Sequence, residues 1–215
     1  ALAYQKDIEA FQLFLTHECS NLEVSKANYS QIRTWIVQLV DGAISNRTIN
    51  RKISSLNSYY KFLLKTESIT TNPLVKHKAL KVSKKIQIPF SETEVNSVLN
   101  SINTDTFEGL RDKLIVELFY STGMRRIELV QLKLQDVDLS QRQIKVLGKR
   151  NKERFIPLLP SVMDTIESYL AERLKLGTIK DTSILFLTNK GTKVYEMLVY
   201  RLITRYFDSV SSKVK

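Results

Sequence analysis

Residues 122–129 read TGMRRIEL and residues 148–154 read GKRNKER, and these two stretches carry most of what the sequence says about fold and function. The first ends an apolar helical pattern at Gly123 and places Arg125 where the next helix should begin. Helix N-termini favour anions, and a guanidinium can hold two phosphate oxygens in its planar fork. The second places Lys149 in a turn between two strand-like runs. Together they predict a site that grips a phosphate beside a mobile proton donor.

Each stretch alone also has an ordinary interpretation. Glu128 follows Arg125 by about one helical turn and could orient its guanidinium, but the two could equally form a surface ion pair without a function. Lys149 could be a solubilising turn lysine. Arg126 is adjacent to Arg125, and composition does not choose between them. It is the joint occurrence of the two stretches that favours chemistry.

The chain is strongly basic, with 33 Lys and Arg against 22 Asp and Glu, a net charge of +11 over 215 residues. This excess favours a polyanionic partner, usually nucleic acid, over a basic membrane-surface protein. The single cysteine, Cys19, excludes an internal disulfide, and no apolar run is long enough for a membrane span or shaped like a signal peptide. We expect a cytoplasmic protein with no membrane partner.

The sequence predicts an N-terminal domain over residues 1–75, a basic linker over 76–89 and a larger domain over 90–215. The first domain reads as helices only, and the linker is lysine-rich and ends at Pro89. Residues 1–85 hold 13 basic and 6 acidic side chains, net +7, against 20 and 16, net +4, in the remainder. Helices are expected over residues 1–16, 29–40 and 46–65.

The larger domain is predicted to combine helices with a few short strands. Ser91 and Glu94 form a capping-box pattern, flanked by Phe90 and Val95 as a hydrophobic staple. Partly alternating runs predict an antiparallel sheet from residues 134–139, 143–147 and 154–158. The expected fold class is therefore mainly α with a small antiparallel β-sheet. Its further helices should cover residues 110–121, 125–132, 161–176 and 194–207.

The two quoted stretches resemble those of the tyrosine recombinase, or phage-type integrase, family, especially its Xer-like site-specific recombinases. The separation of Arg125 from Lys149, 149 minus 125 or 24 residues, also resembles that of the family. Residues 45–63 resemble the last helices of the family's N-terminal core-binding domain, so the resemblance covers nearly the whole chain. It implies a helical, SAM-like core-binding domain and a mixed α+β catalytic domain that together clamp double-stranded DNA.

The resemblance also implies a reaction, site-specific DNA recombination without metal or other cofactor. In the family, a tyrosine attacks the scissile phosphate to give a 3'-phosphotyrosyl link, and strands rejoin through a Holliday junction. Arg125 would match the first catalytic arginine and stabilise charge on the non-bridging oxygens. Lys149 would match the hairpin lysine that protonates the leaving 5' oxygen, with Glu128 orienting Arg125. A homo- or hetero-tetramer on two DNA sites is implied as well.

The chain departs from the family pattern toward its C-terminus. The family needs a His-x-x-Arg motif and a nucleophilic tyrosine there, but His17 and His77 both lie earlier and neither begins that motif. Tyr195, Tyr200 and Tyr206 repeat among apolar residues, which predicts a core or an interface. We therefore expect a chain truncated at both ends, with a catalytic domain incomplete at its C-terminus. These 215 residues should bind DNA without cleaving it.

Three groups of residues are predicted to contact DNA. Amide and guanidinium groups on one helix face can read base edges or phosphates, although a merely solvated face is the alternative. Linker lysines would add affinity without sequence information, and Arg150 would shift the left-handed turn residue to Asn151. The groups are Arg47, Asn50, Arg51, Lys52 and Lys61 in the third helix, Lys81, Lys84 and Lys85 in the linker, and Arg150 and Lys152 in the hairpin.

Two other functions fit parts of the pattern. A non-catalytic DNA-binding regulator derived from a recombinase would keep the clamp and lack the nucleophile. A type IB topoisomerase would share the chemistry, but the Xer-like N-terminal helices argue against it.

Overall fold

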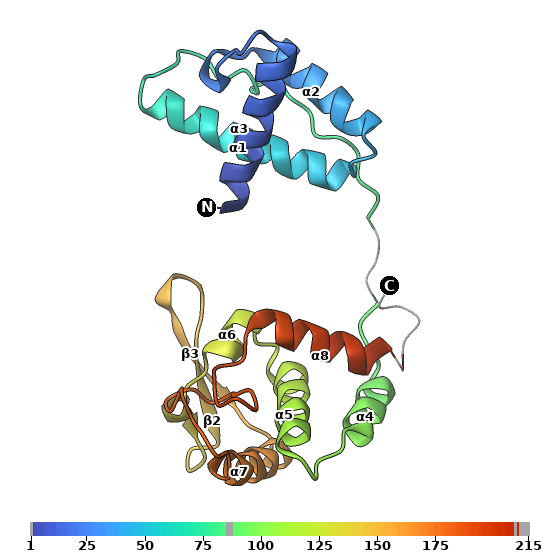
Figure 1. The fold of residues 1–215 in the computed structure, drawn as a ribbon, viewed down its shortest axis with the longest axis vertical. Coiled ribbons are helices and arrows are strands. Elements are labelled where there is room, and N and C mark those ends of the chain that lie inside the picture. Colours follow the sequence, from blue (N-terminus) through green and yellow to red (C-terminus); the bar gives the residue numbers. More distant parts are fainter. Residues whose placement is uncertain (1, 85–87, 209, 211–215) are drawn as a thin grey trace. The chain divides into compact units, whose positions relative to one another are not determined.

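The computed structural model describes residues 2–84, 88–208 and 210. The chain forms two compact units, Ala1–Gln87 and Ile88–Lys215 (Figure 1). The first unit is helical and the second combines helices with one small antiparallel sheet. The predicted fold class, mainly α with a small antiparallel sheet, is confirmed.

The N-terminal unit contains α1 (Leu2–Glu18), α2 (Tyr29–Asp41) and α3 (Asn46–Lys65), with a short 3-10 helix, Val24–Lys26. Local sequence explains the helix starts: Asn28 and Gln31 form a capping box on α2, and the Ser45 hydroxyl accepts the Thr48 backbone N–H of α3. The apolar stripe of α3 is buried against α1 and α2, and includes Ile49, Ile53, Leu56 and Tyr60.

The segment after α3 forms neither helix nor strand, yet much of it is bound to the N-terminal unit. Leu74 is buried in the core of that unit. The Asn50 amide donates to the Leu80 carbonyl and accepts from the Leu80 N–H, both at 2.9 Å. Asn46 donates to the Lys81 carbonyl at 2.9 Å. The first part of the predicted linker, 76–89, is therefore extended but held against α3.

The C-terminal unit surrounds α5 with the remaining helices and the sheet (Figure 1). The Ser91–Glu94 capping box predicted for α4 is confirmed, and Phe90 packs on Phe207 with ring centroids 4.4 Å apart. Its elements are α4 (Glu92–Ser101), α5 (Phe107–Thr122), α6 (Arg126–Gln131), β1 (Val137–Asp138), β2 (Gln143–Leu147), β3 (Glu153–Pro157), α7 (Pro160–Leu174) and α8 (Glu196–Asp208).

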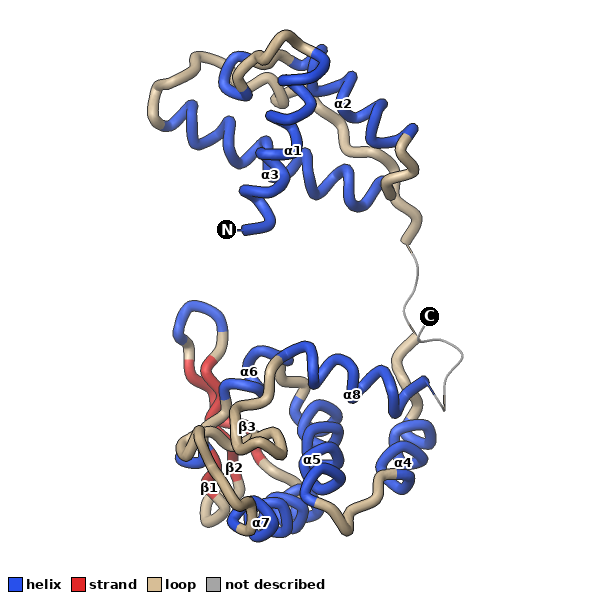
Figure 2. The backbone as a smooth tube through the Cα atoms, viewed as in Figure 1, coloured by secondary structure: helices blue, strands red, loops and turns tan. Residues whose placement is uncertain are grey.

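The three strands pair antiparallel in the order β1-β2-β3, with Lys145 opposite Phe155 and Leu147 opposite Glu153. Alternate residues of β2, Ile144 and Val146, are buried in the core. The tip of the β2–β3 hairpin, with its short helical turn, projects on the side where α6 lies, and α7 lies at the opposite end of the unit (Figure 2).

The first strand is shorter than predicted. Residues 134–139 were expected to be a strand, but Leu134–Asp136 form a 3-10 helix and only Val137–Asp138 pair with β2. The reason is local: the Asp136 carboxylate accepts the backbone N–H of Lys133 at 2.9 Å, which closes a tight turn in place of an extended run.

Candidate active site and nucleic-acid interface

Arg125 lies at the junction between α5 and α6. Gly123 ends α5 in the left-handed conformation, with φ of 61° that favours glycine. Arg125 is the residue that caps α6, as the sequence predicts, and its backbone is extended. Its side chain is 66% exposed. The junction thus presents a guanidinium to solvent from a well-defined backbone position.

Glu128 binds Arg125 in two ways. Its carboxylate accepts the Arg125 backbone N–H at 2.9 Å and the Arg125 Nη1 at 2.7 Å. The Glu128 side chain is only 3% exposed, so it cannot reorient freely. The pairing expected from the three-residue spacing is therefore present, with a buried carboxylate that fixes the direction of an exposed guanidinium.

Arg154, on β3, is a second partner of Glu128 that the sequence analysis missed. Its Nη1 and Nη2 donate to Oε1 and Oε2 of Glu128 at 3.2 and 2.8 Å. Hydrogen bonds from Arg154, opposed by burial and aided by those from Arg125, lower the pKa of Glu128 to about 2. Glu128 is therefore ionised at neutral pH. The signal available in the sequence was the second arginine of GKRNKER, Arg154.

Lys149 lies at the tip of the β2–β3 hairpin, as predicted. Gly148 donates its N–H to the Lys152 carbonyl at 2.8 Å, and Asn151 takes the left-handed backbone, with φ of 59°. Lys149 and Lys152 are exposed, and their side chains have no hydrogen-bond or ion-pair partner within the described residues. The side chain of Arg150 lies outside the described part of the structure.

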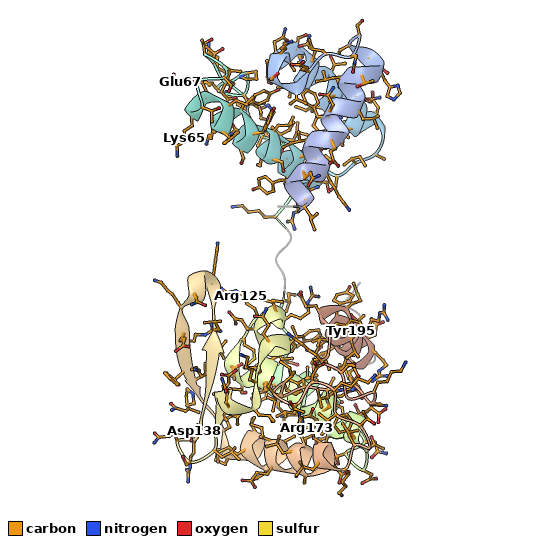
Figure 3. All side chains as sticks on the ribbon, turned by 60° about the vertical axis from the view of Figure 1, so that its left-hand side comes forward. Lys65, Glu67, Arg125, Asp138, Arg173 and Tyr195 are labelled. Carbon is orange, nitrogen blue, oxygen red and sulfur yellow. The ribbon has the colours of Figure 1, made fainter. Side chains whose placement is uncertain are left out.

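The hairpin base and the arginine junction are brought together in space. A Cβ on Gly148, the residue before Lys149, would lie 3.6 Å from Glu128 Oε1 and 3.1 Å from Arg154 Nη1. Figure 3 shows Arg125 on the side of the unit toward which the hairpin tip points, with Asp138 and Arg173 at the other end. Two motifs separated in sequence therefore form one cationic site.

The predicted DNA face of α3 is only partly available for contacts. Arg47 and Lys61 are exposed, and no hydrogen bond or ion pair of their side chains occurs within the described residues. The Asn50 amide is engaged with the Leu80 backbone on both its oxygen and its nitrogen. Asn50 therefore positions the following segment, a role that the sequence analysis did not foresee.

Arg51 and Lys52 are paired with Asp7 of α1. Asp7 is 3% exposed and accepts hydrogen bonds from both Arg51 guanidinium nitrogens, from Lys52 at 3.3 Å and from Ser55 at 2.8 Å. Burial by itself would raise the pKa of Asp7, but the bonds from Arg51, Ser55 and Lys52 hold it below its usual value. Arg51 keeps half of its side chain exposed, whereas Lys52 is 17% exposed. Arg51 can still face a polyanion and Lys52 much less so.

The remaining predicted positions are the linker lysines and the C-terminal tyrosines. Lys81 and Lys84 are exposed, and Lys85 lies outside the described residues. Tyr195 and Tyr200 were predicted to lie in a core or an interface; they are 52% and 54% exposed, so the core placement is wrong and the interface stays a prediction. The buried stripe of α8 runs through Val199, Leu202 and Phe207 and bypasses both tyrosines.

Tyr206 is the partly buried member of the three C-terminal tyrosines. Its hydroxyl donates to Asp112 at 3.3 Å. Burial, followed by the charge of Asp112, raises the pKa of Tyr206. The hydroxyl therefore belongs to a polar contact between α8 and α5.

Among the described residues, no group of three or more His, Cys, Asp or Glu side chains could hold a metal ion. Across the same residues, none of the helices combines the length and the hydropathy required to cross a bilayer.

A basic helical unit is followed by a unit in which an Arg–Glu–Arg cluster adjoins a lysine hairpin. This arrangement can accept an anion such as a phosphate. The chain belongs to the phage integrase family. The model of the phage integrase family matches residues 88–213, and that of the phage integrase N-terminal SAM-like domain matches residues 1–67. The resemblance drawn from the two sequence stretches is confirmed.

Curated relatives include proteins named tyrosine recombinase XerC. The protein of Staphylococcus carnosus is 38% identical over 168 residues, which cover 78% of this chain and 56% of the relative. That of Staphylococcus epidermidis is 34% identical over 194 residues, which cover 90% of this chain and 64% of the relative. The chain thus spans less than two thirds of the length of either relative.

Solved structures share the fold at low sequence identity. The Tn1549 transposon integrase in complex with transposon right end DNA has a TM-score of 0.73 and 18% identity, covering 97% of this chain and 74% of that one. A lambda integrase tetramer bound to a Holliday junction has a TM-score of 0.71 and 16% identity, covering 98% and 57%. At these identities the likeness establishes the fold.

Proposed function

We propose that this protein takes part in site-specific recombination of double-stranded DNA. The observation that carries the proposal is the cationic site in which buried Glu128 directs exposed Arg125 beside the base of the Lys149 hairpin. The curated relatives named tyrosine recombinase support it. The protein would act on cytoplasmic DNA, where the single Cys19 stays reduced.

In the proposed reaction, Arg125 binds a non-bridging oxygen of the scissile phosphate and stabilises the charge that develops there. Lys149, on the exposed hairpin tip, donates a proton to the leaving 5' oxygen. Glu128 keeps Arg125 directed while remaining ionised itself, since its pKa is about 2. The sequence of 215 residues offers no His-x-x-Arg motif, so we propose that these residues alone bind DNA without cleaving it.

The proposed DNA contacts outside this site are exposed cations of both units. Arg47, Arg51 and Lys61 would contact DNA from α3, and Lys152 from the hairpin, whereas Asn50 and Lys52 are assigned to the internal contacts that they make. The lambda integrase structure is a tetramer on a Holliday junction. We propose a homo- or hetero-tetramer on two DNA sites for this protein too.

Two measurements on the 215-residue chain test the proposal. Binding to a short duplex should be salt-dependent and should weaken in Arg125→Gln, while a nicked suicide substrate should give no covalent adduct. Absence of binding would refute the DNA-directed function. An adduct would refute the binding-only assignment, and peptide mapping would then show whether Tyr195, Tyr200 or Tyr206 had reacted.

A further inference from the structure

The guanidinium of Arg154 binds both oxygens of the Glu128 carboxylate, whereas the guanidinium of Arg125 binds one of them. The two terminal nitrogens of Arg154 form a fork with both carboxylate oxygens, at 3.2 and 2.8 Å. Arg125 uses one terminal nitrogen, at 2.7 Å, together with its backbone N–H. One buried anion is therefore shared by two guanidiniums from different parts of the fold, the residue that caps α6 and strand β3.

The sharing changes the net charge of the site. Glu128 with Arg125 alone would be a neutral pair, and a neutral pair attracts a phosphate weakly. With Arg154 present the cluster carries a net charge of +1. Arg125 exposes 66% of its side chain, against 39% for Arg154. The excess charge is thus presented mainly through Arg125.

The backbone of the hairpin is adapted to this arrangement. A Cβ on Gly148 would lie 3.1 Å from Arg154 Nη1 and 3.3 Å from the Lys152 carbonyl oxygen, both tighter than ordinary contact. A side chain there would push the guanidinium away from Glu128. Gly148 thus lets the hairpin that carries Lys149 approach the Arg154–Glu128 pair closely.

We propose that Arg154 is a positioning residue that takes up the charge of Glu128, so that Arg125 retains a positive charge for a DNA phosphate. The proposal rests on the assignment of Arg125 to a phosphate under the proposed function. Arg154 acts through Glu128, because both ends of its guanidinium fork are already bound to that carboxylate. It also ties β3, and with it the Lys149 hairpin, to the start of α6.

A double-mutant cycle measures this coupling directly. Affinity for a short fluorescent DNA duplex is determined for the unsubstituted chain, Arg125→Gln, Arg154→Gln and the double variant. We expect Arg125→Gln to weaken binding about ten-fold in the unsubstituted chain. In the Arg154→Gln background, Arg125→Gln should reduce the affinity for the duplex by less than about two-fold, because Glu128 already neutralises Arg125 there.

Arg142 provides a charge-matched control, since it is exposed in the β1–β2 turn and its side chain has no hydrogen-bond or ion-pair partner within the described residues. In the Arg142→Gln background the cost of Arg125→Gln should stay at about ten-fold. Arg154→Lys guards against a folding defect because it keeps a cation on Glu128, and most of the Arg125 effect should be retained. Thermal unfolding of every variant identifies any that has lost its structure.

The outcomes separate this inference from the proposed function. If the unsubstituted chain does not bind the duplex, or if Arg125→Gln has no effect in it, the proposed function fails. If Arg125→Gln matters but costs the same with and without Arg154, the inference fails and the proposed function stands. Equal loss of the Arg125 effect in Arg154→Lys and Arg154→Gln would also overturn it, because charge would not be the cause.

Discussion

At the scale of single residues, the lowered pKa of Glu128 leads us to expect that the C-terminal unit loses stability in acid. The pKa of Glu128 is lowered from 4.5 to about 2, first by Arg154, against the opposing effect of burial, and then by Arg125. A carboxyl whose pKa falls on folding contributes stability that is complete above the unfolded pKa and declines as pH drops toward the folded one. The contribution should therefore be full above about pH 4.5 and disappear toward pH 2.

The matching experiment compares Glu128→Gln with the unsubstituted chain by amide hydrogen exchange of β2 and β3 residues. Glu128→Gln leaves two guanidiniums without their anion and should lower the free energy of unfolding by about 3 kcal/mol at neutral pH. The difference in stability between the two proteins should shrink in acid. Glu153→Gln is the control, because Glu153 is 54% exposed and its ion pair with Lys145 contributes about 1 kcal/mol or less. A difference that stays constant with pH would contradict the prediction.

Asp7 makes the corresponding prediction for the N-terminal unit. Asp7 of α1 binds Arg51, Lys52 and Ser55 of α3. Because Asp7→Asn removes the charge from this buried network, it should lower the free energy of unfolding of the N-terminal unit by about 3 kcal/mol. The ring centroids of Trp35, the single tryptophan, and Phe11 of α1 are 4.9 Å apart. Trp35 fluorescence therefore follows the unfolding of this unit alone in urea titrations.

An exposed acid of the same helix, Glu9, serves as the control for Asp7→Asn. Glu9→Gln should shift the urea midpoint of Trp35 fluorescence very little. If Asp7→Asn and Glu9→Gln unfold at the same urea midpoint, the Asp7 cluster does not hold α1 to α3.

At the scale of secondary-structure elements, the β2–β3 hairpin depends on Gly148. In Gly148→Ala the new methyl group meets Arg154 Nη1 and the Lys152 carbonyl, so we expect a loss of about 1–2 kcal/mol. Gly177→Ala is the matched control, because nothing lies within 4 Å of its Cβ, and it should be neutral or slightly stabilising. Chemical denaturation followed by circular dichroism measures both, and equal values would show that the hairpin has room for a side chain.

Elements were predictable from sequence where short-range rules decide them. The Ser91–Glu94 capping box and the Gly123 helix end each depend on residues within one turn, and both are present. Contacts over longer separations were not predictable: Arg154 is 26 residues from Glu128, and Arg51 is 44 residues from Asp7. No periodicity encodes such pairs. They also decide which of the predicted cations are available to a ligand.

At the scale of the whole molecule, composition predicted a basic chain of two domains, and the resemblance carried by the two motifs implied the integrase family. They could not predict how the surface is used. Helical spacing placed Tyr195 and Tyr200 in a core or an interface without choosing between them. The neighbouring elements decide which face of α8 is buried, and both tyrosines lie outside that face. Likewise, the attachment of the predicted linker to α3 depends on Asn46 and Asn50, whose amides the sequence shows only as polar groups.

The same attachment makes the linker lysines a testable part of the DNA interface. The Asn46 amide donates to the Lys81 backbone carbonyl, so Lys81 lies beside the N-terminal end of α3. Arg47, in the first turn of that helix, is exposed. Replacing Lys81, Lys84 and Lys85 by Gln should reduce the magnitude of the slope of log affinity against log salt by about 2.7, because each of three phosphate contacts contributes about 0.9. Replacing Lys175, Lys180 and Lys190 instead removes the same charge from the region that follows α7, and should change the slope much less. Equal slopes for the two triple variants would mean that the linker contributes only general charge and does not contact the phosphates.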